Sequence, residues 1–230
     1  MKDSYNNLEK YINNKGLSLY DWAINEIESF YIDNNSKYVI KEKWKTLKES
    51  INNKKPLYIR GRCKHADEYI KIYAKLDWNV KTDNKVNYLP KKSLGEITTY
   101  WVNNQDFKYK ERYITGYTVS HIWGYTHNPL LFNCPWNICY TPISIDPLTG
   151  HMTKSEMKSE FKKRFLKSEY YKKIVKPYVK EYNTLLKEIY PKIEKAISIN
   201  HTLTKVQKNN FLKEWSEINP KNIFEGENII

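Results

Sequence analysis

The chain has 230 residues, of which 40% are hydrophobic and 15% aromatic, and this composition excludes wholesale disorder. Lys and Arg number 39 against 26 Asp and Glu, and the resulting net charge of +13 favours a polyanionic partner, with nucleic acid ahead of an anionic membrane surface. No apolar run approaches the roughly 20 residues that cross a bilayer, and no secretory signal is visible, so we expect a soluble cytoplasmic protein with no membrane partner.

The first 55 residues carry helical patterns. Ser18 is placed to cap a helix whose apolar residues recur at spacings of three and four up to Phe30. A second helical stretch covers residues 37–51 and ends before Pro56. We therefore expect residues 1–55 to form a helical N-terminal arm or subdomain.

The pattern then changes to a period of two. Apolar and polar residues alternate over 69–76 as in a half-buried strand, and residues 57–59, 97–101 and 113–119 are also typical of strands. We therefore expect residues 56–112 to form a β-rich region that serves DNA recognition or acts as a scaffold.

Helical patterns return after Pro147. Apolar residues over 157–174 predict one amphipathic helix ending before Pro177, those over 179–193 predict a second, and Phe211 with Trp215 marks a short last one. Between residues 154 and 180, ten Lys or Arg face three Glu, so more than half of the excess charge falls on this stretch.

The segment between these regions combines a β-prone run ending in His121, a loop, a second β-prone run opened by Asn137, a turn and the basic helix. A histidine at a strand end can take a proton from water, and an Asn amide or a backbone carbonyl can hold its ring in one tautomer. An Asp or His at the start of the helix can bind a divalent ion that stabilises the phosphorane. These parts suffice to hydrolyse a phosphodiester.

Residues 117–165 resemble the HNH, or ββα-metal, endonucleases, in a variant found in some type II restriction enzymes. The matching residues are His121-Ile122-Trp123, Asn128-Pro129, Phe132, Asn137-Ile138, Pro142 and His151. The helical and strand patterns together predict an α+β fold with helical N- and C-terminal segments, in which the C-terminal helices cover 169–230. The resemblance implies that the central β-rich region holds a ββα-metal-like nuclease core over 113–168. We expect all these regions to form one compact unit.

The resemblance also implies roles for single residues. His121 matches the general base and Asn137 the central Asn of the catalytic motif, with Mg²⁺ or Mn²⁺ as cofactor. Ser120 stands where many members have a metal-binding Asp or His. His151 matches the last metal ligand, but Asp146 fits the family's usual spacing better and is a hard oxygen donor, so both stay candidates.

The function predicted from the sequence is that of a site-specific, metal-dependent endonuclease of double-stranded DNA, a type II restriction enzyme. A homodimer would match a palindromic target. The chain has 4 Arg against 35 Lys and abundant Asn, which would suit an A·T-rich site. Basic residues in two runs are the candidate DNA contacts: Arg60, Arg62, Lys64, Lys162, Lys163 and Arg164.

Two alternatives remain open. A restriction nuclease with a carboxylate–lysine site of the PD-(D/E)XK type would use acidic residues of the 56–112 region. The carboxylates available there are Asp67, Glu68, Asp77, Asp83 and Glu96. The other alternative is a non-enzymatic, basic nucleic-acid-binding protein with structural histidines. On either view His127 and Asn128 are expected to shape the loop rather than to bind a ligand.

Overall fold

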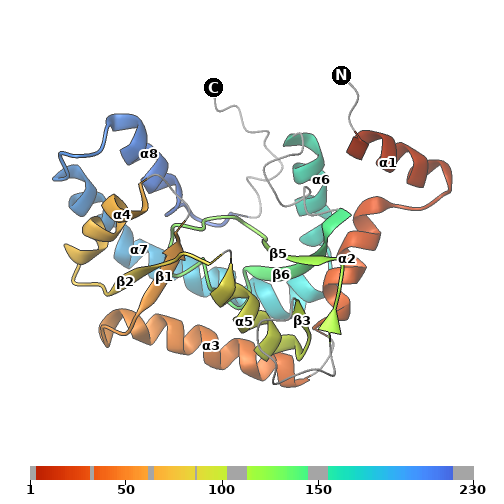
Figure 1. Cartoon of the computed structure of the whole chain (residues 1–230), viewed down its shortest axis with the longest axis horizontal. Helices are drawn as coiled ribbons and strands as arrows, with labels where there is room; N and C mark the ends of the chain where they lie inside the picture. The colour runs from red at the N-terminus through yellow and green to blue at the C-terminus, as the bar shows by residue number, and fades with distance from the viewer. Residues whose placement is uncertain are drawn as a thin grey trace.

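The computed structural model describes residues 4–31, 34–61, 65–85, 87–102, 113–144 and 155–219. It confirms a mixed α+β fold, in which helices surround three small two-stranded sheets (Figure 1). The elements are α1 Ser4–Asn14, α2 Leu19–Ser29, α3 Asn34–Asn52, β1 Leu57–Arg60, α4 Ala66–Ala74, β2 Val80–Asp83, α5 Tyr88–Thr98, β3 Trp101–Val102, β4 Tyr113–Ile114, β5 Tyr117–His121, β6 Ile138–Pro142, α6 Ser155–Phe165, η2 Tyr171–Val175, α7 Lys176–Ser198 and α8 Lys205–Lys213.

The helical prediction for the first 55 residues is confirmed. The side chain of Ser18 caps α2 by accepting a hydrogen bond from the backbone N–H of Asp21 at 3.2 Å. Leu19, Ala23 and Ile27 then face the core with no exposed surface. The longer α3 begins at residue 34 and ends at Asn52.

The strand predicted over residues 69–76 is wrong, because this segment belongs to α4. Tyr69, Ile72 and Tyr73 are its buried residues, and this spacing of three and four is helical. The helix connects β1 to β2, which pair in parallel, and a parallel pair needs such a crossover. Tertiary pairing of the strands therefore decided the local structure.

The strand predicted over residues 97–101 is also largely wrong. Ile97 and Thr98 complete α5, and Thr99 ends the helix in the left-handed conformation with φ of 62°. Only Trp101 and Val102 form a strand, β3. The region 56–112 is therefore not β-rich in its described part, since α4 and α5 occupy much of it.

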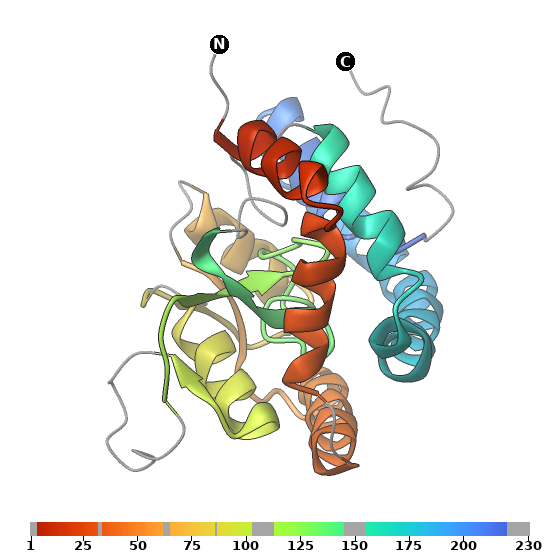
Figure 2. The same ribbon diagram turned by 90° about the vertical axis from the view of Figure 1, so that its right-hand side faces the viewer.

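An antiparallel hairpin of β5 and β6 lies in the middle of the fold. His121 is paired with Ile138, so Asn137 stands directly before the start of β6. Helix α2 packs against β6 on one side and α6 on the other (Figure 2). Tyr31, which follows α2, donates its hydroxyl proton to the carbonyl oxygen of Ile138 at 2.9 Å. The hairpin is thus held at the end that carries His121.

The helical character of the C-terminal region is confirmed, but the single helix predicted over 157–174 is wrong, because the chain turns at residues 166–168 after α6 and the part that follows runs into α7. Pro177 does not end a helix; it is the second residue of α7 and lies directly after a π-helical turn, where the regular pattern of α-helical hydrogen bonds is already interrupted. The π-helical turn η2 leads directly into α7. Helix α8 begins with a capping box between Thr204 and Gln207.

Buried side chains from α2 through to Ile218 form one hydrophobic cluster. The three tryptophans with almost no exposed surface, Trp44, Trp136 and Trp215, come from α3, from the loop between β5 and β6, and from the residues after α8. None of the helices in the described ranges is both long and apolar enough to pass through a membrane.

Candidate functional site

The ring of His121 has a defined tautomer. Its Nε2 lies 2.8 Å from the backbone carbonyl oxygen of Phe132, in the loop that follows β5. Because a carbonyl oxygen can only accept, Nε2 carries the ring proton in the neutral form and Nδ1 carries the lone pair. The ring of Phe132 stacks on the imidazole with centroids 5.6 Å apart and fixes its plane.

The environment keeps His121 uncharged. Burial lowers the pKa of His121 to about 4, since an imidazolium ion in this position would lose most of its hydration. The hydrogen bond to Phe132 and the negative charge of Glu214 oppose this shift, while the positive charge of Arg60 adds to it. About 8% of the residue's surface remains exposed. At pH 7 His121 is therefore a neutral base.

Asn137 shapes the loop rather than the histidine ring. Its Oδ1 accepts the backbone N–H of Trp123 at 3.0 Å, and its Nδ2 donates to the carbonyl oxygens of Gly124 and Leu131 at 3.2 and 2.9 Å. The side chain is completely buried. Of the two devices that could fix the tautomer of His121, the structure therefore shows the backbone carbonyl, and Asn137 acts as a positioning residue.

Arg60 belongs to the same site. It ends β1, and its backbone N–H donates to the carbonyl oxygen of Thr126, in the loop between β5 and β6, at 2.9 Å. Its positive charge is one of the smaller causes of the lowered pKa of His121. Within the described ranges, no carboxylate forms an ion pair with its guanidinium. The structure therefore brings together a base and a cation that lie 61 residues apart in the sequence.

A second histidine of the loop is bound to a carboxylate. The Nδ1 of His127 lies 3.3 Å from Oε1 of Glu214, and Oε2 of the same carboxylate accepts the backbone N–H of His127 at 2.9 Å. The Nε2 of His127 is buried and has no hydrogen-bond partner within the described ranges. Sequence reasoning assigned His127 to loop formation and missed Glu214, because nothing in the sequence links α8 to the loop.

The expected metal ligands Asp146 and His151 lie outside the described residues, as do Arg62 and Lys64. Among the residues that are described, no three His, Cys, Asp or Glu side chains gather in a way that could hold a metal ion. Carboxylate oxygens are the donors that Mg²⁺ and Mn²⁺ favour, whereas an imidazole suits softer transition metals, so by donor chemistry Asp146 is the better match to Mg²⁺ of the two predicted ligands.

The basic helix expected after the hairpin is α6, where Arg164 has a structural role. Its Nη1 donates to Ser18 Oγ at 2.9 Å and to Asp21 Oδ1 at 2.8 Å, and its Nε donates to Glu160 Oε1 at 2.8 Å. Arg164 therefore joins α6 to the start of α2. DNA contacts by Lys162 and Lys163, on the same helix, stay a prediction.

The carboxylates of the alternative site have separate partners. Glu68 binds Lys71 and Thr202, and Asp83 accepts the backbone N–H groups of Lys85 and Leu89. The others that form ion pairs do so with lysines elsewhere: Asp77 with Lys54 and Glu96 with Lys43. These carboxylates therefore make separate local contacts, and the described structure does not bring them together into one acidic site.

The comparisons place the chain in a family. A family described as "Uncharacterised protein PM1201" matches residues 32–223, and the chain belongs to it. This chain is 29% identical over 182 residues to "Uncharacterized protein PM1201" of Pasteurella multocida (strain Pm70). The alignment covers 77% of this chain and 78% of the relative. No solved structure matches significantly. The matched range contains the hairpin, Arg60 and Glu214.

Proposed function

We propose that this member of the PM1201 family is a site-specific, metal-dependent endonuclease that hydrolyses phosphodiester bonds of double-stranded DNA. The observation that carries the proposal is the contact between His121 Nε2 and the carbonyl oxygen of Phe132. It gives a neutral imidazole with its lone pair on Nδ1, at the end of a strand in a strand–strand–helix order. Within the described ranges, no carboxylate forms an ion pair with Arg60. This positive charge and the net charge of +13 suit a phosphate substrate.

In the proposed reaction, Nδ1 of His121 accepts a proton from a water molecule. The oxygen of this water bonds to the phosphorus, the bond from phosphorus to the 3′ oxygen breaks, and the released oxygen takes a proton from solvent. Arg60 balances the charge of the phosphate, and the hydrogen bonds of Asn137 hold in place the loop that presents the Phe132 carbonyl. General-base assistance typically contributes a factor of about 10²–10⁴ and is largest when the pKa of the base lies near the working pH. With a pKa of about 4, His121 is neutral at pH 7 but is a weaker base than a free histidine.

A divalent ion, Mg²⁺ or Mn²⁺, would be held by Asp146 or His151. When bound, such an ion supplies positive charge at the phosphate oxygens. The target is proposed to be an A·T-rich palindrome read by a homodimer, because Asn reads adenine and because two-fold symmetry of the protein matches that of the site.

The test is digestion of a long phage DNA by the purified protein, with magnesium and with a chelator. His121→Ala removes the base, and His201→Ala is the matched control, because His201 is exposed in the segment between α7 and α8. We expect discrete fragments with magnesium only, unchanged cutting by His201→Ala, and at least about 10²-fold slower cutting by His121→Ala.

Each other result has a distinct meaning. Cutting by His121→Ala at the rate of the unmutated protein would remove His121 as the base and favour the carboxylate–lysine alternative. A smear in place of bands would retain the nuclease and overturn site specificity. DNA that stays intact but shifts on a gel would establish a binding protein. His121→Gln serves as a second variant if His121→Ala fails to fold.

A further inference from the structure

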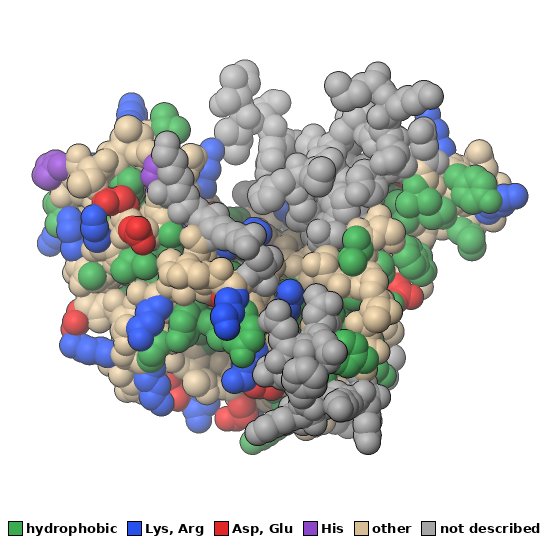
Figure 3. Space-filling view, viewed as in Figure 1, with side chains coloured by type: hydrophobic (Ala, Val, Ile, Leu, Met, Phe, Trp, Pro, Cys, Tyr) green, Lys and Arg blue, Asp and Glu red, His purple; other side chains and the backbone are tan. Residues whose placement is uncertain are grey.

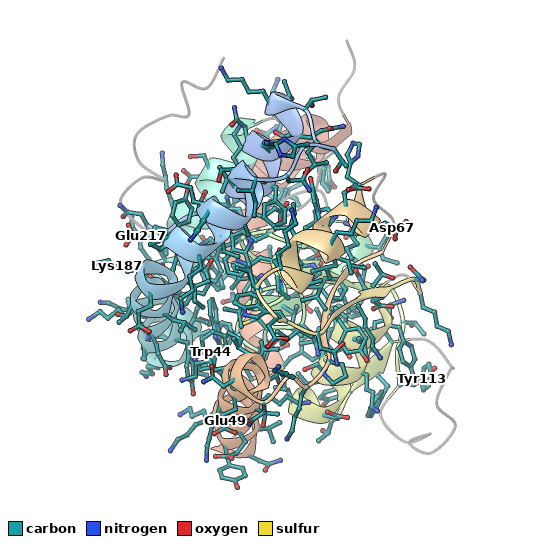
Figure 4. All side chains as sticks on the ribbon, turned by 90° about the vertical axis from the view of Figure 1, so that its left-hand side faces the viewer. Trp44, Glu49, Asp67, Tyr113, Lys187 and Glu217 are labelled. Atoms are coloured by element: carbon teal, nitrogen blue, oxygen red, sulfur yellow. The ribbon has the colours of Figure 1, made fainter. Side chains whose placement is uncertain are left out.

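A groove with a strongly basic lining lies between α3 and the η2–α7 segment, and its lining does not include His121, Asn137 or Arg60 of the hairpin site. Its volume is about 380 Å³. Trp44 forms part of it and lies between α3 and α7 (Figure 4). The residues that line the groove are Lys37, Lys41, Trp44, Lys45, Lys48, Lys173, Ile174, Pro177, Tyr178 and Glu181. Five lysines therefore surround a single acidic residue in this lining.

The one carboxylate of the lining is already compensated. Glu181 forms an ion pair with Lys48 and accepts the indole N–H of Trp44 at 2.8 Å. Lys37 and Lys41 are exposed, and in the described parts of the chain neither forms an ion pair with an acidic residue. Lys45 has only a long contact of 4.0 Å to Glu49. The groove therefore keeps an uncompensated positive charge along α3.

The lysines are spaced in a line. Lys37, Lys41 and Lys45 recur every four residues and so share one face of α3. At about 1.5 Å per residue they cover about 12 Å, over which one strand of a DNA duplex presents three or four phosphates. Figure 3 shows Lys and Arg side chains along the lower edge of the molecule, over α3, with acidic side chains among them.

Trp44, the largest aromatic residue of the groove, is not available to unstacked bases, and Tyr178 is half-buried, so the groove offers no row of free aromatic faces. Trp44 is 1% exposed, and its ring packs edge-on against Trp136 with centroids 5.3 Å apart. A single strand would need free aromatic faces on which to stack, whereas a duplex keeps its bases inside and presents phosphates. The chemistry of the groove therefore matches the backbone of a duplex.

We propose that the groove between α3 and α7 binds the phosphate backbone of double-stranded DNA, independently of sequence and separately from the hairpin site. Lysine suits this role because its ammonium group is a point charge that contacts phosphates without reading bases. The proposal concerns binding alone, so it stands whether or not the protein cuts DNA.

The experiment measures binding of a labelled 20-base-pair duplex by fluorescence anisotropy, with a chelator present and salt varied from about 50 to 200 mM, the range over which phosphate contacts strongly affect affinity. The test variant combines Lys37→Gln, Lys41→Gln and Lys45→Gln. The matched control combines Lys192→Gln, Lys195→Gln and Lys205→Gln, which removes the same charge from exposed positions of α7 and α8.

We expect the groove variant to bind at least about tenfold more weakly than the control at the lowest salt. The slope of the logarithm of affinity against the logarithm of salt concentration should fall by about 3, because three phosphates lose their lysine contact. Equal affinities and slopes for the two variants would overturn the proposal. Weaker binding to single-stranded DNA or RNA alone, with duplex binding unchanged, would also overturn it. Because cleavage is blocked by the chelator, His121→Ala should bind as tightly as the unmutated protein, which separates this result from the test of the nuclease.

Discussion

The carboxylate of Glu214 holds His127 at two points, the backbone N–H at 2.9 Å and the ring Nδ1 at 3.3 Å. The two residues are 87 positions apart, and their contact ties the loop between β5 and β6 to the residue that follows α8. The same carboxylate affects the pKa of His121. The geometry of the hairpin site therefore depends on the C-terminal helices.

Removing this contact should weaken the fold. In Glu214→Gln, the amide can accept at only one of its two ends, so one N–H of His127 loses its acceptor, and we expect the free energy of unfolding to fall by about 1–3 kcal/mol. Urea unfolding measures the change. Glu217→Gln is the control, since Glu217 is exposed and should shift stability by less than about 0.5 kcal/mol. Equal effects of the two substitutions would show that the contact contributes nothing.

The side-chain amide of Asn137 should contribute more to the free energy of unfolding than that of nearby Asn133. Asn137→Ala leaves the N–H of Trp123 and two loop carbonyls without their partner, and we expect a loss of about 2–4 kcal/mol. The Oδ1 of Asn133 has no hydrogen-bond partner in the described structure, so Asn133→Ala should cost much less. Thermal and urea unfolding of both variants compare them directly, and a reversed order would contradict the assigned role.

The free energy of unfolding should fall as the pH is lowered through the window between the two pKa values of His121, one in the unfolded chain and one in the folded protein. Its pKa is about 4 in the folded protein and about 6.5 in the unfolded chain, so between these values only the unfolded chain binds the proton. The contribution of His121 is thus fully present above pH 6.5 and is lost as the pH falls towards 4. Between pH 7 and pH 5 we expect a loss of about 2 kcal/mol. Urea unfolding at both pH values measures it, and His121→Gln should flatten this difference while His201→Gln leaves it unchanged.

Substitution of Arg164 should lower stability, whereas substitution of Lys163 should weaken DNA binding without lowering stability. Arg164→Ala breaks the bonds to Ser18, Asp21 and Glu160, and because these groups are partly exposed we expect a loss of only about 1 kcal/mol. Lys163→Ala should leave stability unchanged within about 0.5 kcal/mol and reduce the salt slope of DNA binding by about 1. Unfolding curves and anisotropy titrations of both variants test this, and a slope that is unaffected by Lys163→Ala would remove α6 from the DNA interface.

The sequence by itself determined the terminal helices, the two strands of the hairpin and the excess of positive charge. Those helices have local signals, such as the Ser18 cap and apolar residues at helical spacing, that need no distant partner to be recognised. His121 and Asn137 could be chosen because they stand where a β-prone run ends and the next begins, and the structure places both at that end of the hairpin.

Only the tertiary structure decided the rest. Residues 69–76 fit a period of two as well as a helix, and the parallel pairing of β1 with β2 settled the choice in favour of α4. The acceptor for the His121 proton is a backbone carbonyl, which any residue at position 132 would supply, so no side chain could reveal it. Glu214, Arg60 and the lysine groove depend on contacts between segments that are remote in the chain. Such contacts are selected by burial and charge in three dimensions and leave no local pattern.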